Sequence, residues 1–409
     1  MYGELVPPIT TDDQKKLDSS VCPFVDETEN EFSINSKLYG MLDQYHPDIG
    51  SFTKLLAGHV TTGDYRSKGA SGGMVKWFLN NALKDNVVDG VIQVRQTEKV
   101  ESLFEYYIAN NPEAVRLGAK SAYYPTNFSD VIREVFESTD ERRFAFVGLP
   151  CFCHSLRLLQ AKYPKLKAKI PLVISIFCGH LKSKHYASLM AMQAGLDNYQ
   201  DPITYIDFRH KTDHDRNASQ YNFYSQHLSS KIYSRRRTAL PAGDWKIPHL
   251  KIKACDFCED VFGSTADIIF GDAWIQPFVK DPLGSNLVII RSQAAMQLIN
   301  DHSDELSFQE INVQDVIKSQ GGSYNHRVRD ISFRLKREKE VFGWAPNKRA
   351  RYVNSIDDIV SQNREKIQLI RTLIREKSRD LFLKVKTANN LAVYTKGVKQ
   401  LIAELNKLY

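Results

Sequence analysis

Two cysteines with the spacing of metal ligands stand in the second half of the chain. Cys255 and Cys258 form a Cys-x-x-Cys pair, a short loop ahead of an apolar run at 266–270 that ends in Gly271-Asp272. Such a turn presents two thiolates at a spacing that suits a zinc ion, an iron-sulfur cluster or a redox disulfide. Two sulfurs do not complete a metal site, so the other ligands must come from elsewhere in the chain.

Two further cysteines occupy matching positions. Cys151 and Cys178 each follow an apolar run typical of a buried strand, at 143–150 and 170–177, and each precedes a helical pattern. Parallel strands gather their carboxyl ends along one edge of a sheet, so we expect these thiols to meet the Cys-x-x-Cys pair there. Three separate segments then supply four sulfurs, the number that a 4Fe-4S cube needs.

Six short motifs follow one another in a fixed order across roughly residues 50 to 330. They are Ala70-Ser-Gly-Gly-Met74, Gly148-Leu-Pro-Cys151, Phe177-Cys-Gly179, Phe208-Arg-His-Lys211, the Cys-x-x-Cys pair and Gly271-Asp-Ala-Trp274. The set resembles the coenzyme F420 hydrogenase/dehydrogenase beta-subunit family, whose members are flavin and iron-sulfur electron-transfer proteins and include reductases of chlorophyll precursors. The resemblance implies that Cys151, Cys178, Cys255 and Cys258 hold a 4Fe-4S cluster, with Cys151 preferred to Cys153 because it occupies the Gly-x-Pro-Cys position.

The glycine-bearing loop at 61–74 is the expected flavin contact. It lies between a strand pattern at 55–60 and a helix expected from about 75 to 84. Glycines ahead of a helix let backbone amides approach an anion, and the helix dipole favours negative charge there, although paired glycines also mark ordinary turns. Arg66 and Lys68 of this loop could supply counter-charge to a flavin pyrophosphate. With the resemblance, the expected cofactor-binding residues are these two, Ser71, Gly72, Gly73 and Met74 of the loop, and Lys211 and Asp272 of the later motifs.

The resemblance implies an oxidoreductase that uses FAD or another flavin together with the cluster. A flavin accepts a hydride and releases electrons singly, and a cluster takes single electrons. The hydride carrier could be coenzyme F420 or another donor, and the acceptor a redox partner protein or a small-molecule substrate. Two other classes stay open: a zinc-binding structural or interaction protein using the same cysteines, and an acyl-transfer enzyme with Cys151 as nucleophile and His154 or His180 as base.

Composition limits the remaining possibilities. The 409-residue chain is 42% hydrophobic, which is enough for a substantial core. No apolar run is as long as a membrane span, and the N-terminus lacks the pattern of a secretory signal. Six clustered cysteines are too few for a disulfide scaffold in a chain of this length and favour a reducing compartment, so we expect a cytoplasmic protein.

We expect an α/β fold with mixed, partly parallel sheets and flanking helices, in three parts. Residues 1–50 form an irregular arm in which Cys22 is a packed thiol. Residues 51–330 form the oxidoreductase core, with an antiparallel insertion at about 203–237. Residues 331–409 form a basic helical region.

The positive charge is concentrated in that last region. The whole chain has a net charge of +7, but residues 331–409 alone carry +10, which leaves −3 for the rest. The core therefore gives no reason to expect nucleic-acid binding. Ile367, Ile370, Leu373 and Ile374 are spaced as one apolar helix face with basic neighbours, so peripheral membrane contact or an acidic partner is possible. A helical pair packed on the core is the favoured interpretation, and an oligomer is possible.

Overall fold

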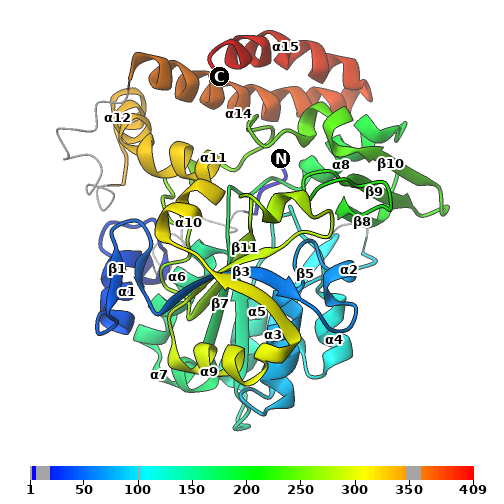
Figure 1. Ribbon diagram of the computed structural model, residues 1–409. Coiled ribbons are helices and arrows are strands. Elements are labelled where there is room, and N and C mark those ends of the chain that lie inside the picture. Colours follow the sequence, from blue (N-terminus) through cyan, green and yellow to red (C-terminus); the bar gives the residue numbers. More distant parts are fainter. Residues whose placement is uncertain (1, 6–18, 100–101, 347–360) are drawn as a thin grey trace.

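An eight-stranded sheet forms the centre of the computed structural model, which describes residues 2–5, 19–99, 102–346 and 361–409 (Figure 1). Its strands, in spatial order, are β13 (Leu306–Glu310), β3 (Lys54–Val60), β12 (Asn286–Ile290), β11 (Ile268–Asp272), β7 (Leu172–Ile176), β6 (Phe144–Gly148), β4 (Gly90–Gln96) and β5 (Phe104–Ala109). The four strands β11, β7, β6 and β4 pair in parallel, and the outer pairings are antiparallel. The predicted mixed, partly parallel sheet is confirmed.

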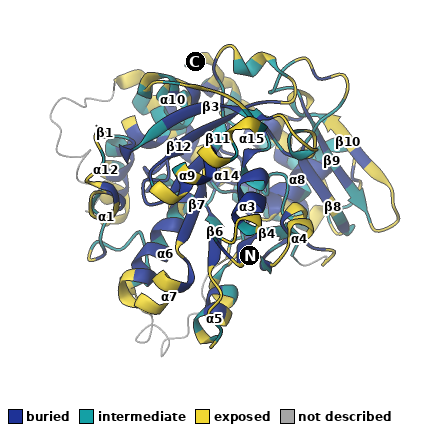
Figure 2. Ribbon diagram, turned by 60° about the horizontal axis from the view of Figure 1, so that its bottom comes forward, coloured by how far each residue is buried: buried dark blue, intermediate teal, exposed yellow. Residues whose placement is uncertain are grey.

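Helices cover both faces of this sheet. On one face, three helices share a core with the side chains of Ile268 and Phe270: α3 (Met74–Lys84), α4 (Pro112–Leu117) and α9 (Gln293–Asp301). On the other face, three helices pack against Phe146 and Val173: α5 (Ser129–Glu137), α6 (Pro150–Lys162) and α7 (Pro164–Lys169). Neighbouring strand residues point to opposite faces, so strands covered on both sides are apolar throughout. Figure 2 shows these strands as buried and the exposed residues on outer helical turns such as those of α7.

The N-terminal segment is more regular than we expected. It contains α1 (Glu31–Tyr39) and a two-stranded ribbon of β1 (Gln44–His46) and β2 (Gly50–Phe52). The helix begins there because the Asn30 side chain accepts hydrogen bonds from two backbone amides of its first turn. The segment docks on the core through Asn35 Nδ2, 2.8 Å from the Ser264 carbonyl oxygen, and the Tyr39 hydroxyl, 2.9 Å from Asp267 Oδ1.

The antiparallel insertion expected at 203–237 is present. Three strands, β8 (Ile203–His210), β9 (Asn222–His227) and β10 (Ile232–Arg236), form a separate sheet in the order β10-β9-β8. Helix α8 (His185–Ala194) covers one side of it, where Tyr186 and Met190 share a core with Phe208 and Phe223. The insertion therefore has an apolar core of its own.

The C-terminal region is helical, as predicted. After α10 (Val313–Ser319), α11 (Gly321–Tyr324) and a π-helical turn at Asn325–Arg329, the chain forms α12 (Ile331–Phe342), α14 (Gln362–Ala388) and α15 (Leu391–Lys407). Figure 1 shows α14 and α15 lying side by side across one end of the molecule, and Phe382 and Tyr394 join the core of the insertion. No helix in the described part of the chain is long and apolar enough to span a membrane.

Candidate functional site

A cavity of about 620 Å³ lies where the parallel strands end. Part of its wall is formed at the carboxyl ends of the strands. Gly148 ends β6 and is followed by Leu149, Phe177 and Cys178 follow β7, and Gly271 and Asp272 end β11. The wall also includes Ser71 and Gly73 of the glycine loop and Gln368 and Arg371 of α14. Open α/β sheets bind ligands at this edge, and the volume is within the usual range for a cofactor pocket.

Four cysteines meet beside this cavity. Cys151 lies in the first turn of α6, Cys178 follows β7, and Cys255 and Cys258 lie at the short helical turn Lys253–Asp256 and just after it. Burial, followed by the proximity of the other three thiols, raises the pKa of Cys151 well above its ordinary value. Burial likewise raises the pKa of Cys178 to about 12. Three distant segments are therefore brought together, as the sequence predicted.

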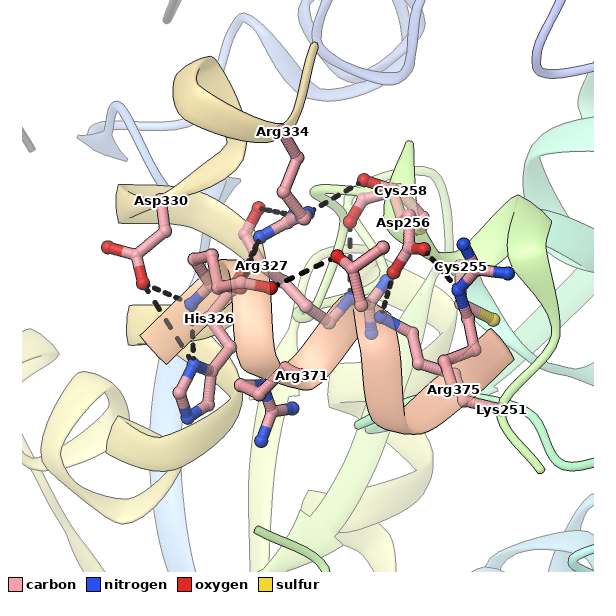
Figure 3. Close-up of polar contacts among 12 residues, drawn as sticks. Lys251, Cys255, Asp256, Cys258, His326, Arg327, Asp330, Arg334, Arg371 and Arg375 are labelled. Carbon is pink, nitrogen blue, oxygen red and sulfur yellow. Dashed lines mark hydrogen bonds and ion pairs between the residues drawn. The ribbon is translucent and has the colours of Figure 1, made fainter. Parts of the chain in front are cut away.

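Two hydrogen-bond donors reach these sulfurs. The backbone amide of Leu181 donates to Cys255 Sγ over 3.2 Å, and Arg327 Nη2 donates to Cys258 Sγ over 2.6 Å. Burial lowers the pKa of Arg327, but the neighbouring Cys258, Cys178 and Cys255 thiolates outweigh it and raise the pKa overall. Figure 3 shows Arg327 together with Cys255 and Cys258. Hydrogen bonds to cysteine sulfur orient cluster ligands and set the reduction potential.

The donor set consists of thiols alone. All six cysteines of the chain are free of disulfide bonds. As the side chains stand, no group of three or more His, Cys, Asp or Glu in the described ranges is arranged to hold a metal ion. The four sulfurs are thus neighbours, but not at the spacing of a coordination shell. Four thiols with amide and guanidinium donors at hand are the chemistry that an iron-sulfur cube requires.

Cys153, the competing ligand, lies elsewhere. It is fully buried in the core between α6 and the sheet, where it packs with Phe146 and Leu156. Its Sγ lies 3.5 Å from the Ile174 carbonyl oxygen, and burial raises its pKa to about 12. Cys153 is therefore a packed core residue, whereas Cys151 is grouped with the other three thiols.

The glycine loop divides between the cavity and the core. Gly73 is the residue before α3, with φ of 83°, and a Cβ there would lie 2.6 Å from the Tyr65 carbonyl carbon. Ser71 Oγ donates to the Ser285 carbonyl oxygen over 2.9 Å. Ser71 and Gly73 line the cavity, whereas Gly72 packs against Asn286 and the Met74 side chain is fully buried.

The predicted basic residues of this region brace the loop and do not line the cavity. Arg66 Nη2 lies 2.6 Å from Asp281 Oδ2 and also donates to the Gly284 carbonyl oxygen. Lys211 Nζ donates to the carbonyl oxygens of Arg66 and Ser71, and burial, assisted by nearby cations, lowers its pKa to about 7. Lys68 is exposed. Arg66 and Lys211 thus hold the backbone that faces the cavity.

Asp272 anchors the end of β11. Its Oδ2 accepts a hydrogen bond from Arg209 Nη1 over 2.7 Å, and its carbonyl oxygen accepts from Ser319 Oγ over 3.0 Å. The Arg209 guanidinium lies over the rings of Tyr221 and Trp274. Asp272 therefore faces the cavity with its charge already balanced.

The cavity is strongly basic. Among the described residues on its wall, Asp272 is the only acid. The nine lysines and arginines are Lys76, Arg95, Lys120, Arg209, Arg237, Lys246, Lys251, Arg327 and Arg371. Such a lining favours ligands with several negative charges. Sequence reasoning missed Arg327 and Arg371, which belong to no motif and lie far along the chain from the cysteines.

The geometry does not favour a cysteine nucleophile. His154 faces α1, with Nε2 2.7 Å from the Glu29 carbonyl oxygen and Nδ1 3.7 Å from Glu31 Oε2. Burial lowers the pKa of His180 well below its ordinary value, and Lys182, Lys251 and other cations add to the effect. The raised pKa of Cys151 is the opposite of what an activated thiolate needs.

Comparison with known proteins agrees with this architecture. Two family models of the coenzyme F420 hydrogenase/dehydrogenase beta subunit match, the model of its N-terminal part over residues 55–133 and the model of its C-terminal part over residues 141–315. Together they span most of the chain and the whole sheet edge just described. The fold and the matches define a redox protein of the hydrogenase and dehydrogenase beta-subunit type. The chain belongs to the coenzyme F420 hydrogenase/dehydrogenase beta-subunit family.

A solved structure shares the fold. A chain of the F420-reducing NiFe hydrogenase complex from Methanosarcina barkeri superposes with a TM-score of 0.54 at 15% sequence identity, covering 74% of this chain and 98% of that chain. At this identity the likeness concerns the fold. A search of curated proteins found no significant match.

Proposed function

We propose that this protein is a flavin- and 4Fe-4S-dependent oxidoreductase. The observation that carries the proposal is the meeting of Cys151, Cys178, Cys255 and Cys258 beside a cavity that a glycine loop also lines. Cys178 itself lines the cavity, so a cluster on these sulfurs would border the space available to a flavin. Short separation is what electron transfer between two bound cofactors needs.

Each group of residues has a defined task in this proposal. The four cysteines hold the cluster, and Leu181 and Arg327 donate hydrogen bonds to its ligands. Ser71 and Gly73 present backbone to FAD or another flavin, while Arg66 and Lys211 keep that loop in place. Asp272 orients Arg209 beside the cavity. When bound, the flavin supplies conversion between hydride transfer and single-electron transfer.

The donor and acceptor follow from the family. Coenzyme F420 or another hydride carrier would exchange electrons with the flavin, and a redox partner protein or a small-molecule substrate would exchange them at the other end. A partner protein is supported by the structural neighbour, which is part of a hydrogenase complex. The basic cavity also admits an anionic small molecule.

Anaerobic purification tests the proposal directly. Flavin, iron, acid-labile sulfide and zinc are assayed after reconstitution, and the visible spectrum is recorded. We expect flavin bands together with a broad cluster shoulder that bleaches on reduction. A colourless protein that binds zinc and no iron would instead support the zinc-binding class.

A further inference from the structure

The end of the cavity next to the C-terminal helices has a wall that the family matches do not include. Gln368 and Arg371 of α14 line it, together with His326 and Arg327 of the π-helical turn. All four lie beyond residue 315, where the second family match ends. Trp245, Lys246 and His180 line the same cavity, and the Lys246 carbonyl oxygen contacts Arg371. This part of the wall therefore lies outside the segments that the family models match.

Arg371 brings a buried positive charge to this wall without a partner of opposite charge. The residue is 7% exposed, and its Nη1 donates to the carbonyl oxygen of Lys246. Among the described residues no carboxylate forms an ion pair with it, and Figure 3 draws no contact from its guanidinium to the other labelled residues. Burial lowers its pKa, while the Tyr409 hydroxyl and, after it, the Asp256 carboxylate act in the opposite direction.

The neighbouring cations already have partners. Lys251 Nζ lies 2.5 Å from Asp256 Oδ1, and Arg375 Nε lies 2.8 Å from Asp256 Oδ2. Arg327 is engaged with Cys258 and with backbone carbonyl oxygens. A single carboxylate thus forms ion pairs with Lys251 and Arg375, whereas Arg371, which also lines the cavity, forms no ion pair with a carboxylate in the described ranges.

His180 provides a second, independent sign of a ligand at this place. The residue is 9% exposed, and its Nε2 has no hydrogen-bond partner in the described part of the chain. The ring lies 4.6 Å from the ring of Trp245, and both side chains line the cavity. A buried ring nitrogen without a partner is costly unless a bound molecule satisfies it.

We propose that this end of the cavity binds the anionic group, a carboxylate or a phosphate, of the second reactant of the redox reaction. The Arg371 guanidinium matches the planar, two-oxygen face of such a group, and His180 supplies a further polar contact. The assignment of the ligand as a reactant rests on the proposed oxidoreductase function. The existence of an anion site does not, because it depends only on this chain's own charges and geometry.

Calorimetric titration of the full-length protein with a matched pair of probes tests the site. Benzoate carries the anionic group, and benzamide has the same shape without the charge. We expect benzoate to bind at least tenfold more tightly than benzamide, and Arg371→Gln to remove that preference. Arg371→Lys should restore part of it. Lys366→Gln is the control, because Lys366 is an exposed cation on the same helix.

Two further measurements separate the possible failures. Equal binding of both probes, or an unchanged preference in Arg371→Gln with a thermal midpoint matching that of the original chain, would refute the anion site. The titrations are repeated with inorganic phosphate as the probe, and again with flavin-loaded protein. Loss of all anion binding on flavin loading would assign this end of the cavity to the flavin and refute the second-reactant proposal. Anion binding by a protein that takes up neither flavin nor iron would refute the oxidoreductase function while keeping the site.

Discussion

The family core and the C-terminal helices contribute to the site in different ways. The core supplies the four cysteine sulfurs and the glycine loop. These groups lie at the ends of strands or in the turns next to them, so the sheet holds them in place. The C-terminal part adds positive charge, with Arg327, Arg371 and Arg375 all buried near the cysteines. The core thus provides the thiols and the glycine loop, and the C-terminal helices bring positive charge close to them.

Replacing a cysteine ligand should have the largest effect and would show that the core alone determines cluster binding. We expect Cys258→Ala to lose nearly all bound iron and sulfide after anaerobic reconstitution, because a cube lacking one thiolate is poorly held. Cys153→Ala is the matched control, since that thiol is packed in the core. Full iron content in Cys258→Ala would show that our ligand set is wrong.

A pair of glycine substitutions compares the two regions in stability. Gly73 has φ of 83° and no room for a Cβ, whereas Gly343 at the end of α12 has φ of 75° with nothing within 4 Å. Gly343→Ala should cost about 1 kcal/mol in free energy of unfolding for its backbone conformation, and Gly73→Ala about 2 kcal/mol or more. Flavin affinity should fall only in Gly73→Ala. Equal losses in urea unfolding would mean that crowding at Gly73 is unimportant.

The docking of the C-terminal helices should be sensitive to acid. His249 is fully buried, with Nδ1 2.8 Å from the Tyr394 hydroxyl of α15, and burial, assisted by Lys182, lowers its pKa from 6.5 to about 3. The unfolded chain then binds more protons over this interval, so stability falls as the pH decreases below 6.5. The loss attributable to this group is about 2 kcal/mol by pH 5.

Denaturant unfolding at pH 7 and pH 5 measures that loss. His249→Asn keeps a polar partner for Tyr394 and removes the titrating ring, so its stability should change less between the two pH values. An identical change in both proteins would assign the acid sensitivity to other groups.

Arg327 should have the smallest but most specific effect, on the potential of the cluster. A cation that donates to a ligand sulfur stabilises the more negative, reduced cluster. Removing it in Arg327→Gln should lower the midpoint potential by on the order of 60 mV, the equivalent of about 1.4 kcal/mol for one electron. Arg329→Gln, an exposed neighbour, is the control. An unchanged potential with full iron content would show that the hydrogen bond does not tune the cluster.

The sequence predicted the parts of the site that carry local signals. Cys151 and Cys178 each follow an apolar run, and the parallel pairing of β6 and β7 brings their carboxyl ends together as that pattern implies. Strand β5 and helix α1 were not anticipated. The short apolar run at Phe104–Ala109 is hard to tell from a buried helical segment by its pattern alone. Helix α1 depends on the Asn30 cap more than on an apolar stripe.

The C-terminal contribution was not predictable for a different reason. Arg371 and Arg375 flank the apolar residues of α14, and the sequence pattern predicted a helical pair packed on the core through the apolar face. In the fold they are buried, while Leu373 of the supposed apolar face is 38% exposed. Periodicity identifies a helix but not the partner that each of its sides meets, and here the partner of one side is a set of buried polar loops around the cysteines.

Asp256 stands between the two cysteines of the Cys-x-x-Cys pair and forms an ion pair with Arg375 of α14. Because α14 is synthesised after the cysteine loop, this pair forms only once α14 has left the ribosome. A nascent chain arrested before α14 should therefore expose Cys258 to thiol-alkylating reagents that the finished protein excludes. The order of synthesis would then leave time for cofactor delivery before α14 covers the thiols.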